Sequence, residues 1–448
     1  MKLTAPSIKI EKDTGFDPEI DIFGRKKFGE QLANIVESTN GEMVIALDSP
    51  WGEGKSTFIH MWQGYVENDR VNRLNTIYFD AFANDYQKDP FLSLASEFYE
   101  FFEEKNSKAV EFKTALGGAA KSLFRGGLKM GVRSISGGIL DGSVVDTVGD
   151  QVSALLADQV DGLVEDRLAH NSADKDAFGE FEKSLSSTIK ELVGDGSLVF
   201  IIDELDRCRP DFALELLENI KHFYSVPKLT FILVTNRTQL EASVNARYGS
   251  GVVANQYLQK FVHLWCSLPR ATGRRGNDGV KYLEYVIERM TIGNEMICIT
   301  AKEMIADILV YERLSCRTIE RISSNFAVIC NVAGHSLNDD HQKICGYLCF
   351  LKVVHLDLFD QCVNNKIDAI SLLEQSDIKN ILERAGRGGD TYREGRFITL
   401  CEIIKYDLAD AAGKRAIDGV NNQNLNLQFL PPGIIKTVCS WLSNFETL

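Results

Sequence analysis

The sequence predicts an α/β fold in which a parallel sheet is followed by an all-α region. Short apolar runs alternate with segments of helical periodicity as far as about residue 270. This is the pattern of strands that crossover helices bury on both faces. A glycine-rich turn follows the first apolar run, and beyond Gly273 the periodicity is helical to the end.

Length and composition exclude several classes of protein. A chain of 448 residues has room for two or three domains. Its net charge of -14 argues against a general nucleic-acid coat but allows a local basic patch. The ten cysteines have no paired spacing, which favours reduced thiols over a disulfide framework. No secretion signal or run of about 20 apolar residues is found, so we expect a cytoplasmic protein.

The expected elements follow in chain order. A helix is expected where Phe28, Leu32, Ile35 and Val36 recur at helical spacing. Strands are expected at 43–47, 76–80, 197–203, 229–235 and 260–268, and further helices at 90–104, 174–193 and around 214–223. Asp89 is expected to cap the helix that begins with proline at 90.

The turn "DSPWGEGKST" resembles the phosphate-binding pattern G-x-x-x-x-G-K-[ST], with Ser49 in place of the first glycine. Gly52 and Gly54 supply a permissive backbone, and Glu53 is expected to point outward. The helix that follows would face an anion with its positive end. The expected nucleotide-binding residues are Pro50, Trp51, Gly52, Glu53, Gly54, Lys55, Ser56 and Thr57. The alternative is a chance glycine turn before a helix.

The run "SLVFIIDELDRCRP" supplies a second half of a nucleotide site. Asp203 and Glu204 follow five apolar residues, at the sheet edge where open α/β folds bind ligands. Asp203 and Ser56 are placed to hold Mg²⁺, and Glu204 to polarise an attacking water. Alternatively, the two acids only begin the next helix.

Asn236 ends the next apolar strand. If this strand lies between the two preceding ones, as in NTPases with an additional strand and a catalytic glutamate, Asn236 points at the attacking water or the γ-phosphate. It could also cap the helix that begins after it.

Two basic segments were considered as binding surfaces. Lys121, Arg125, Lys129 and Arg133 recur every fourth residue in a glycine-rich segment. They could lie on nucleic acid or an anionic membrane surface, or form a solvated face of a loosely packed insertion. Residues 386–396 are interpreted as an exposed loop, with phosphate contact as the alternative.

Several motifs together resemble the KAP family of P-loop NTPases. These are "DIFGRKKFGEQL", "FDAFANDYQKDPFLSL", "IIDELDRCRP", "YLQKFVHLWCSLPR" and "LSCRTIERISSNF", which span roughly residues 20 to 330. The sequence departs from the family pattern at Ser49, at Phe82 where tryptophan is common, and at Cys316 where proline is usual.

The resemblance implies roles for further residues. Arg317 would be a lid arginine that reaches the γ-phosphate. Arg207 or Arg209 would act on its own site or as an arginine finger on a neighbouring subunit. Phe23, Gly24 and Arg25 would line the adenine side. Bacterial relatives of this kind are associated with exclusion of viruses, so the resemblance also suggests antiviral defence.

The sequence therefore predicts a P-loop core at 18–270 with a helical insertion at about 105–195, a helical lid at 271–335 and a C-terminal helical domain at 336–448. The expected activity is Mg²⁺-dependent ATP hydrolysis that drives a switch or motor. Self-association or a protein partner is also expected. The alternative is a scaffold that binds ATP without turnover and recruits a protein partner or a membrane surface.

Overall fold

The computed structural model describes most of the chain. The described residues are 2–6, 10, 14–39, 43–87, 89–105, 108–125, 179–273, 276–292, 298–333, 337–420 and 433–445, with the backbone alone at 118–125, 272–273 and 418–420. Of the basic stripe, Lys129 and Arg133 lie outside these residues, and the side chains of Lys121 and Arg125 do too.

A five-stranded parallel sheet has the order β2-β3-β4-β1-β5. Its strands are β1 (Met43–Asp48), β2 (Leu74–Asp80), β3 (Ser197–Asp203), β4 (Leu229–Thr235) and β5 (Leu264–Ser267). All residues of β3 and β4 are buried, as their continuous apolar sequences predict. The insertion of β4 between β1 and β3 is confirmed. The fifth strand begins later than residue 260, since the amides of Lys260 and Phe261 still donate to carbonyls at the end of α9.

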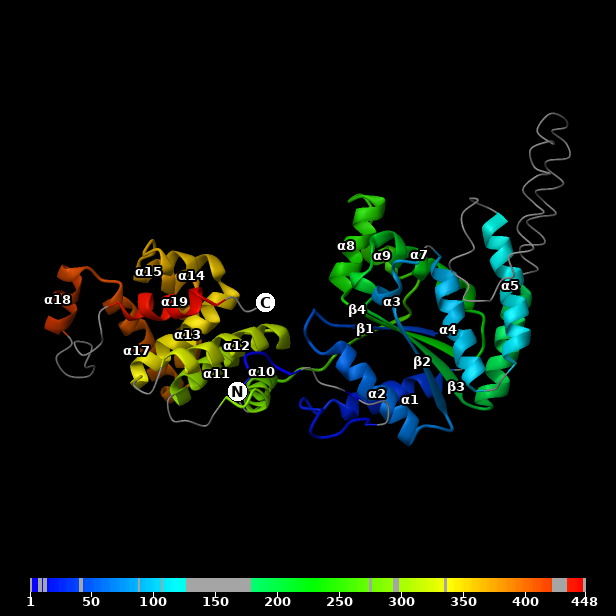
Figure 1. Cartoon of the computed structure of the whole chain (residues 1–448), viewed down its shortest axis with the longest axis horizontal. Helices are drawn as coiled ribbons and strands as arrows, with labels where there is room; N and C mark the ends of the chain where they lie inside the picture. The colour runs from blue at the N-terminus through cyan, green and yellow to red at the C-terminus, as the bar shows by residue number, and fades with distance from the viewer. Residues whose placement is uncertain are drawn as a thin grey trace, which may run out of the picture.

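Helices cover both faces of the sheet (Figure 1). On one face α1 (Lys26–Ser38) and α2 (Lys55–Asp69) bury a core that contains Trp62. On the other face α4 (Pro90–Glu104), α7 (Pro210–Ile220) and a helix at 179–193 bury a core of phenylalanines that includes Phe98 and Phe200. Asp89 caps α4 as expected, accepting hydrogen bonds from Phe91 and Leu92.

Shorter elements complete the sheet lobe. They are α3 (Ala81–Asn84), α5 (Ala109–Arg125), the 3-10 turns η3 (Leu205–Arg207) and η4 (Lys221–Phe223), α8 (Arg237–Tyr248), α9 (Ala254–Leu258) and a small antiparallel pair of β6 (Thr272–Gly273) and β7 (Gly276–Asn277).

From residue 278 on, the described chain is helical and forms a second lobe beside the first (Figure 1). Its helices are α10 (Asp278–Arg289), α11 (Ile299–Tyr311), α12 (Cys316–Val332), α13 (Asp339–Val354), α14 (Leu356–Val363), α15 (Ala369–Gln375), α16 (Ile378–Arg387), α17 (Thr391–Asp407), α18 (Ala411–Val420) and α19 (Ile434–Ser443). One hydrophobic core runs through this lobe from Tyr282 to Leu442. The boundary predicted near residue 335 falls within that core and stays a prediction.

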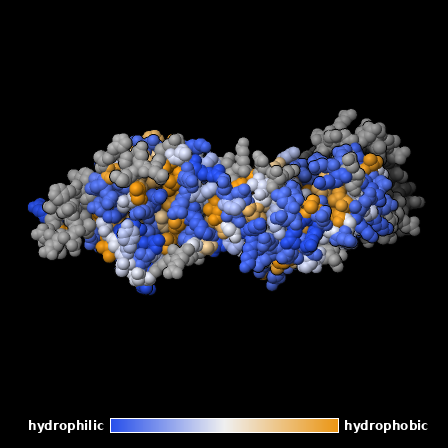
Figure 2. Space-filling view, turned by 90° about the horizontal axis from the view of Figure 1, so that it is seen from below, coloured by the Kyte–Doolittle hydropathy of each residue, from blue (hydrophilic) through white to orange (hydrophobic). Residues whose placement is uncertain are grey.

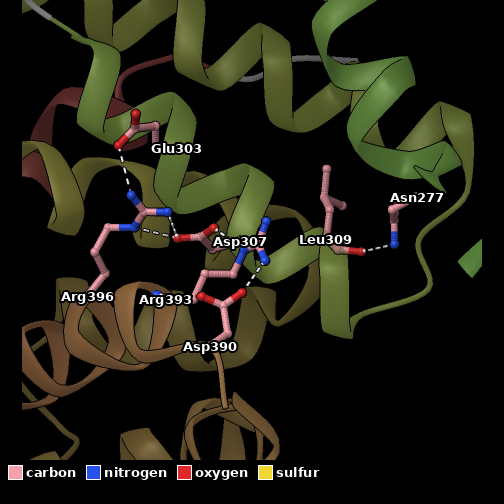
Figure 3. Close-up of polar contacts among 7 residues, drawn as sticks. All are labelled: Asn277, Glu303, Asp307, Leu309, Asp390, Arg393 and Arg396. Atoms are coloured by element: carbon pink, nitrogen blue, oxygen red, sulfur yellow. Dashed lines mark hydrogen bonds and ion pairs between the residues drawn. The ribbon is translucent and has the colours of Figure 1, made fainter. Parts of the chain in front are cut away.

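An ion-pair network joins α11 to α17 within the helical lobe (Figure 3). Asp307 of α11 is almost fully buried and accepts hydrogen bonds from Arg393 (Nε, 2.8 Å) and Arg396 (Nε, 2.6 Å). Asp390 caps α17, so the helix begins at Thr391. The interpretation of 386–396 as an exposed loop was therefore wrong, because the cap converts its second half into a helix whose arginines are paired.

The described surface is mostly polar on the face that Figure 2 shows. Hydrophilic residues cover most of the face in Figure 2, and hydrophobic residues lie between them in separate small groups. Among the described residues, no helix is long and apolar enough to cross a bilayer.

Candidate functional site

The turn after β1 has the backbone that phosphate binding requires. Gly52 and Gly54 have φ of 78° and 79°, and α2 begins at Lys55. A left-handed backbone at these positions favours glycine. Ser49 has no positive φ, so the serine in the first glycine position causes no backbone strain. We call residues 49–56 the phosphate loop.

Lys55 is folded onto the phosphate loop. Its Nζ donates to the carbonyl oxygens of Ser49 at 2.5 Å and Pro50 at 3.3 Å. Burial lowers the pKa of Lys55, and the nearby carboxylates Asp206 and Asp203 act against that shift. The ammonium therefore lies against the phosphate loop, near the carboxylates at the end of β3.

Asp203 ends β3 beside this loop and is almost fully buried. It accepts hydrogen bonds from the hydroxyl of Ser56, the hydroxyl of Tyr78 at 3.1 Å and the amide of Glu204 at 2.7 Å. Burial raises its pKa, and these hydrogen bonds oppose the rise. A serine hydroxyl in contact with a carboxylate is a set of hard oxygen donors that fits Mg²⁺.

Glu204 has a strained backbone and a paired side chain. Its φ of 58° lies in the left-handed region, which costs a non-glycine residue about 1 kcal/mol or more. Its carboxylate is 2.8 Å from a guanidinium nitrogen of Arg207. Burial raises the pKa of Glu204, while Arg207 lowers it. Strain of this kind is frequent at functional sites.

Two residues beside these acids were not predicted. Asp206 is buried, faces Lys55 and accepts a hydrogen bond from Nε1 of Trp51. Tyr78 binds Asp203 from the neighbouring strand. The third acid of "DELDR" was a visible signal for Asp206. Nothing in the sequence singled out Tyr78, because its role depends on the strand order.

Arg209 and Asn236 lie at the same edge of the sheet. Arg209 binds Asp85, with its amide 3.1 Å from Oδ2 of that residue and its guanidinium on the carbonyl. Asn236 follows β4 and caps α8 by accepting from Thr238 at 3.1 Å. The capping role expected as one alternative is therefore present. β4 pairs with β1, which places Asn236 beside the phosphate loop.

Glu53 does not point outward. Its side chain is only 7% exposed and forms an ion pair with Arg270, which is 8% exposed. Arg270 also donates to the carbonyl of Leu314, just before α12. The prediction for Glu53 was wrong because its partner lies 217 residues away in the sequence.

Arg25 supports the same loop from behind. It is buried, and its guanidinium donates to the carbonyls of Glu53 at 3.0 Å and Pro269 at 3.3 Å. Burial lowers its pKa. Phe23 lies under this guanidinium at 4.5 Å and contacts Tyr282 of α10 at a ring distance of 5.9 Å. Gly24 between them has a φ of 64°. The adenine-side role of these three residues stays a prediction.

The start of α12 touches the phosphate loop directly. The amide of Cys316 donates to the carbonyl of Gly52 at 2.9 Å, a bond that proline at this position could not make. A Cβ placed on Gly52 would lie 3.0 Å from Cβ of Arg317. The guanidinium of Arg317 is exposed and forms no ion pair with any described residue. Arg317 therefore lies next to the phosphate loop, and no acid of the described residues pairs with it.

A family model matches the part of the chain that contains the phosphate loop, Asp203 and Arg317. The family model described as KAP family P-loop domain matches residues 25–333. No curated protein matches the chain. Solved structures that match include the ORC2 protein of Aeropyrum pernix in ADPNP-ADP complexes, at 11% identity and a TM-score of 0.36, covering 94% of this chain and 95% of that one.

A second match is the ORC1 protein of Aeropyrum pernix in complex with DNA. It shares 12% identity at a TM-score of 0.33, and the alignment covers 94% of this chain and 83% of that one.

Proposed function

Because the chain belongs to the KAP family of P-loop domains, we propose that it binds Mg²⁺-ATP and hydrolyses it to switch the position of its lid. The observation that carries this proposal is the meeting of two distant segments. Ser56 at the start of α2 contacts Asp203 at the end of β3, with Lys55 and Glu204 on either side.

The proposed roles follow from these positions. The amides of the phosphate loop and Lys55 bind the β- and γ-phosphates. Ser56 and Asp203 hold Mg²⁺, which neutralises charge on the phosphates. Glu204 accepts a proton from water, a role that its burial favours by raising its pKa. Arg317, as part of the lid, contacts the γ-phosphate.

Hydrolysis would be tested with two substitutions. Lys55→Ala is expected to weaken nucleotide binding and abolish phosphate release, since the cation that meets the phosphates is lost. Glu204→Gln is expected to abolish release while binding is kept. The matched control is Glu383→Gln, an exposed residue of α16. Phosphate release by Glu204→Gln at the wild-type rate would remove Glu204 from this role.

One observation favours a second candidate, an ATP-binding scaffold without turnover. Arg207 already occupies the carboxylate of Glu204 at 2.8 Å, so this glutamate is not free to act as a base in this conformation. The two candidate functions are distinguished by measuring phosphate release in the presence of DNA, in the presence of anionic vesicles and with neither added. Tight binding without release under all three conditions would support the scaffold.

We further propose a role in defence against viruses, which the family resemblance supports. Bacteria that express the chain should form fewer phage plaques than bacteria that express Lys55→Ala at the same level. Equal plaque numbers across a panel of phages would contradict this role without bearing on ATP hydrolysis.

A further inference from the structure

A groove runs along the open edge of the sheet, beside the nucleotide site. It has a volume of about 940 Å³, and β2 forms its floor through Thr76 and Tyr78. One wall belongs to α2 and the other to α4. These helices cover opposite faces of the sheet, so the groove between them follows the sheet edge. Ile10 adds an apolar side chain to the lining.

The backbone of β2 presents free hydrogen-bonding groups to this groove. The amide of Ser197 in β3 donates to the carbonyl of Arg73 at 2.8 Å. Backbone groups of successive strand residues point to opposite sides, so those of Asn75 and Ile77 also face β3. Those of Thr76 and Tyr78 face away from β3. Within the described residues they have no backbone partner.

The walls of the groove are acidic. Glu97, Glu100 and Glu104 of α4 and Glu67 of α2 line it, and the basic side chains in its lining are Lys105 and His60. None of the four carboxylates forms an ion pair with a described residue. Burial and the neighbouring Glu100 raise the pKa of Glu97 to about 7. The groove therefore lacks the positive charge that would balance its walls.

We propose that this groove binds an extended, lysine- or arginine-rich segment of a partner protein as an additional strand on β2. A free strand edge takes an extended chain through main-chain hydrogen bonds, and pockets on either side choose the side chains. The backbone groups of Thr76 and Tyr78 that face away from β3 can form the main-chain hydrogen bonds. The glutamates on the walls select basic side chains. The same acids disfavour nucleic acid as the occupant.

The groove reaches the nucleotide site. Ser56 and Tyr78 line it, and both also bind Asp203. An occupant would thus contact residues that hold the acid at the end of β3. Binding itself does not depend on ATP turnover, so the peptide experiment stands apart from the hydrolysis experiment.

The test measures peptide binding to the full chain by fluorescence anisotropy. The probe is a labelled nonapeptide of alternating lysine and threonine. Glu97→Gln, Glu100→Gln and Glu104→Gln together are expected to weaken binding about tenfold, because three ion pairs are lost. The matched control removes the same charge from exposed sites, with Glu284→Gln, Glu288→Gln and Glu383→Gln. Equal losses in both triple variants would overturn the proposal.

A second arm uses the wild-type chain and tests the strand geometry. A peptide N-methylated on the residues that face β2 should bind about tenfold more weakly or worse, because it cannot pair with the backbone. A peptide methylated on the alternate residues should bind as the unmodified one does. Hydrogen exchange at Thr76 and Tyr78 should slow when the unmodified peptide is added. Equal binding of both methylated peptides would overturn the proposal.

Discussion

Asp307 in the helical lobe and Glu53 in the sheet lobe are both buried against arginine. Asp307 of α11 binds Arg393 and Arg396 of α17, and all three belong to helices that share one hydrophobic core (Figure 3). Glu53 of the phosphate loop binds Arg270, which also holds the carbonyl of Leu314 ahead of α12.

The two networks have the same chemistry and different surroundings. Around Asp307 apolar packing already fixes the helices, so its ion pairs chiefly avoid an unpaired buried charge. Around Glu53 the joined parts are a sheet loop and a helical lobe. We therefore expect the first network to determine stability and the second to determine where the start of α12 lies relative to the phosphate loop.

The largest effect on stability is expected from Asp307→Ala. Removing one partner of a buried ion pair typically costs about 3–5 kcal/mol. Arg393 and Arg396 would keep only Asp390 and Glu303 as their ion-pair partners among the described residues. Urea denaturation followed by far-ultraviolet circular dichroism measures this loss. The control is Asp360→Ala at an exposed position. A loss below about 1 kcal/mol would show that the arginines are solvated after the change.

Glu53→Gln is expected to act mainly on the nucleotide. The neutral side chain no longer holds Arg270, so the contact between the phosphate loop and the start of α12 weakens. The affinity for an ATP analogue should therefore fall about tenfold. Asp307→Ala, in the fraction that stays folded, should bind the analogue like the wild type. Combining Glu53→Gln with Arg270→Met should lose less affinity than the sum of the single changes, since coupled residues are not additive. If the losses of affinity were additive, Glu53 and Arg270 would act on nucleotide binding independently of each other.

Gly52→Ala disturbs the contact between the phosphate loop and the start of α12 without removing a charge. The new methyl group would lie 3.0 Å from the Cβ of Arg317, at a φ of 78° that disfavours alanine. The expected cost is about 1–3 kcal/mol, together with weaker nucleotide binding. Gly251→Ala is the matched control, because an added Cβ there meets nothing within 4 Å. Isothermal titration with the ATP analogue and thermal unfolding compare the two variants.

A half-buried carboxylate without an arginine partner among the described residues, Glu97, sharpens the comparison. The folded-state pKa of Glu97 is raised to about 7 from 4.5, by burial and by Glu100. Glu97 therefore stabilises the fold fully at pH values below its unfolded-state pKa. This stabilisation is lost as the pH rises through about 7. The urea midpoint of the wild type should fall over this range more than that of Glu97→Gln. If the urea midpoints of the wild type and of Glu97→Gln changed with pH in parallel, this prediction would be contradicted.

The sequence was sufficient for the strands of the sheet and for the residues that end them. Continuous apolar runs predicted β1, β3 and β4, and the glycine and acid motifs placed Lys55 and Asp203 at one edge. Glu53, Tyr78 and Arg270 were not assigned correctly, because their partners come from distant segments and no local pattern marks them. The cap at Asp390 was missed because glycines nearby suggested a loop.

The bond between Gly52 and Cys316 has a consequence for synthesis of the chain. The ribosome makes the phosphate loop early, but the partners that brace it, Arg270 and Cys316, emerge more than two hundred residues later. A nascent chain that stops before Arg270 carries the whole glycine-lysine-serine fingerprint with Arg25 but without Arg270 and Cys316 to brace it. The nucleotide pocket of this protein is therefore finished only after translation has passed the start of α12.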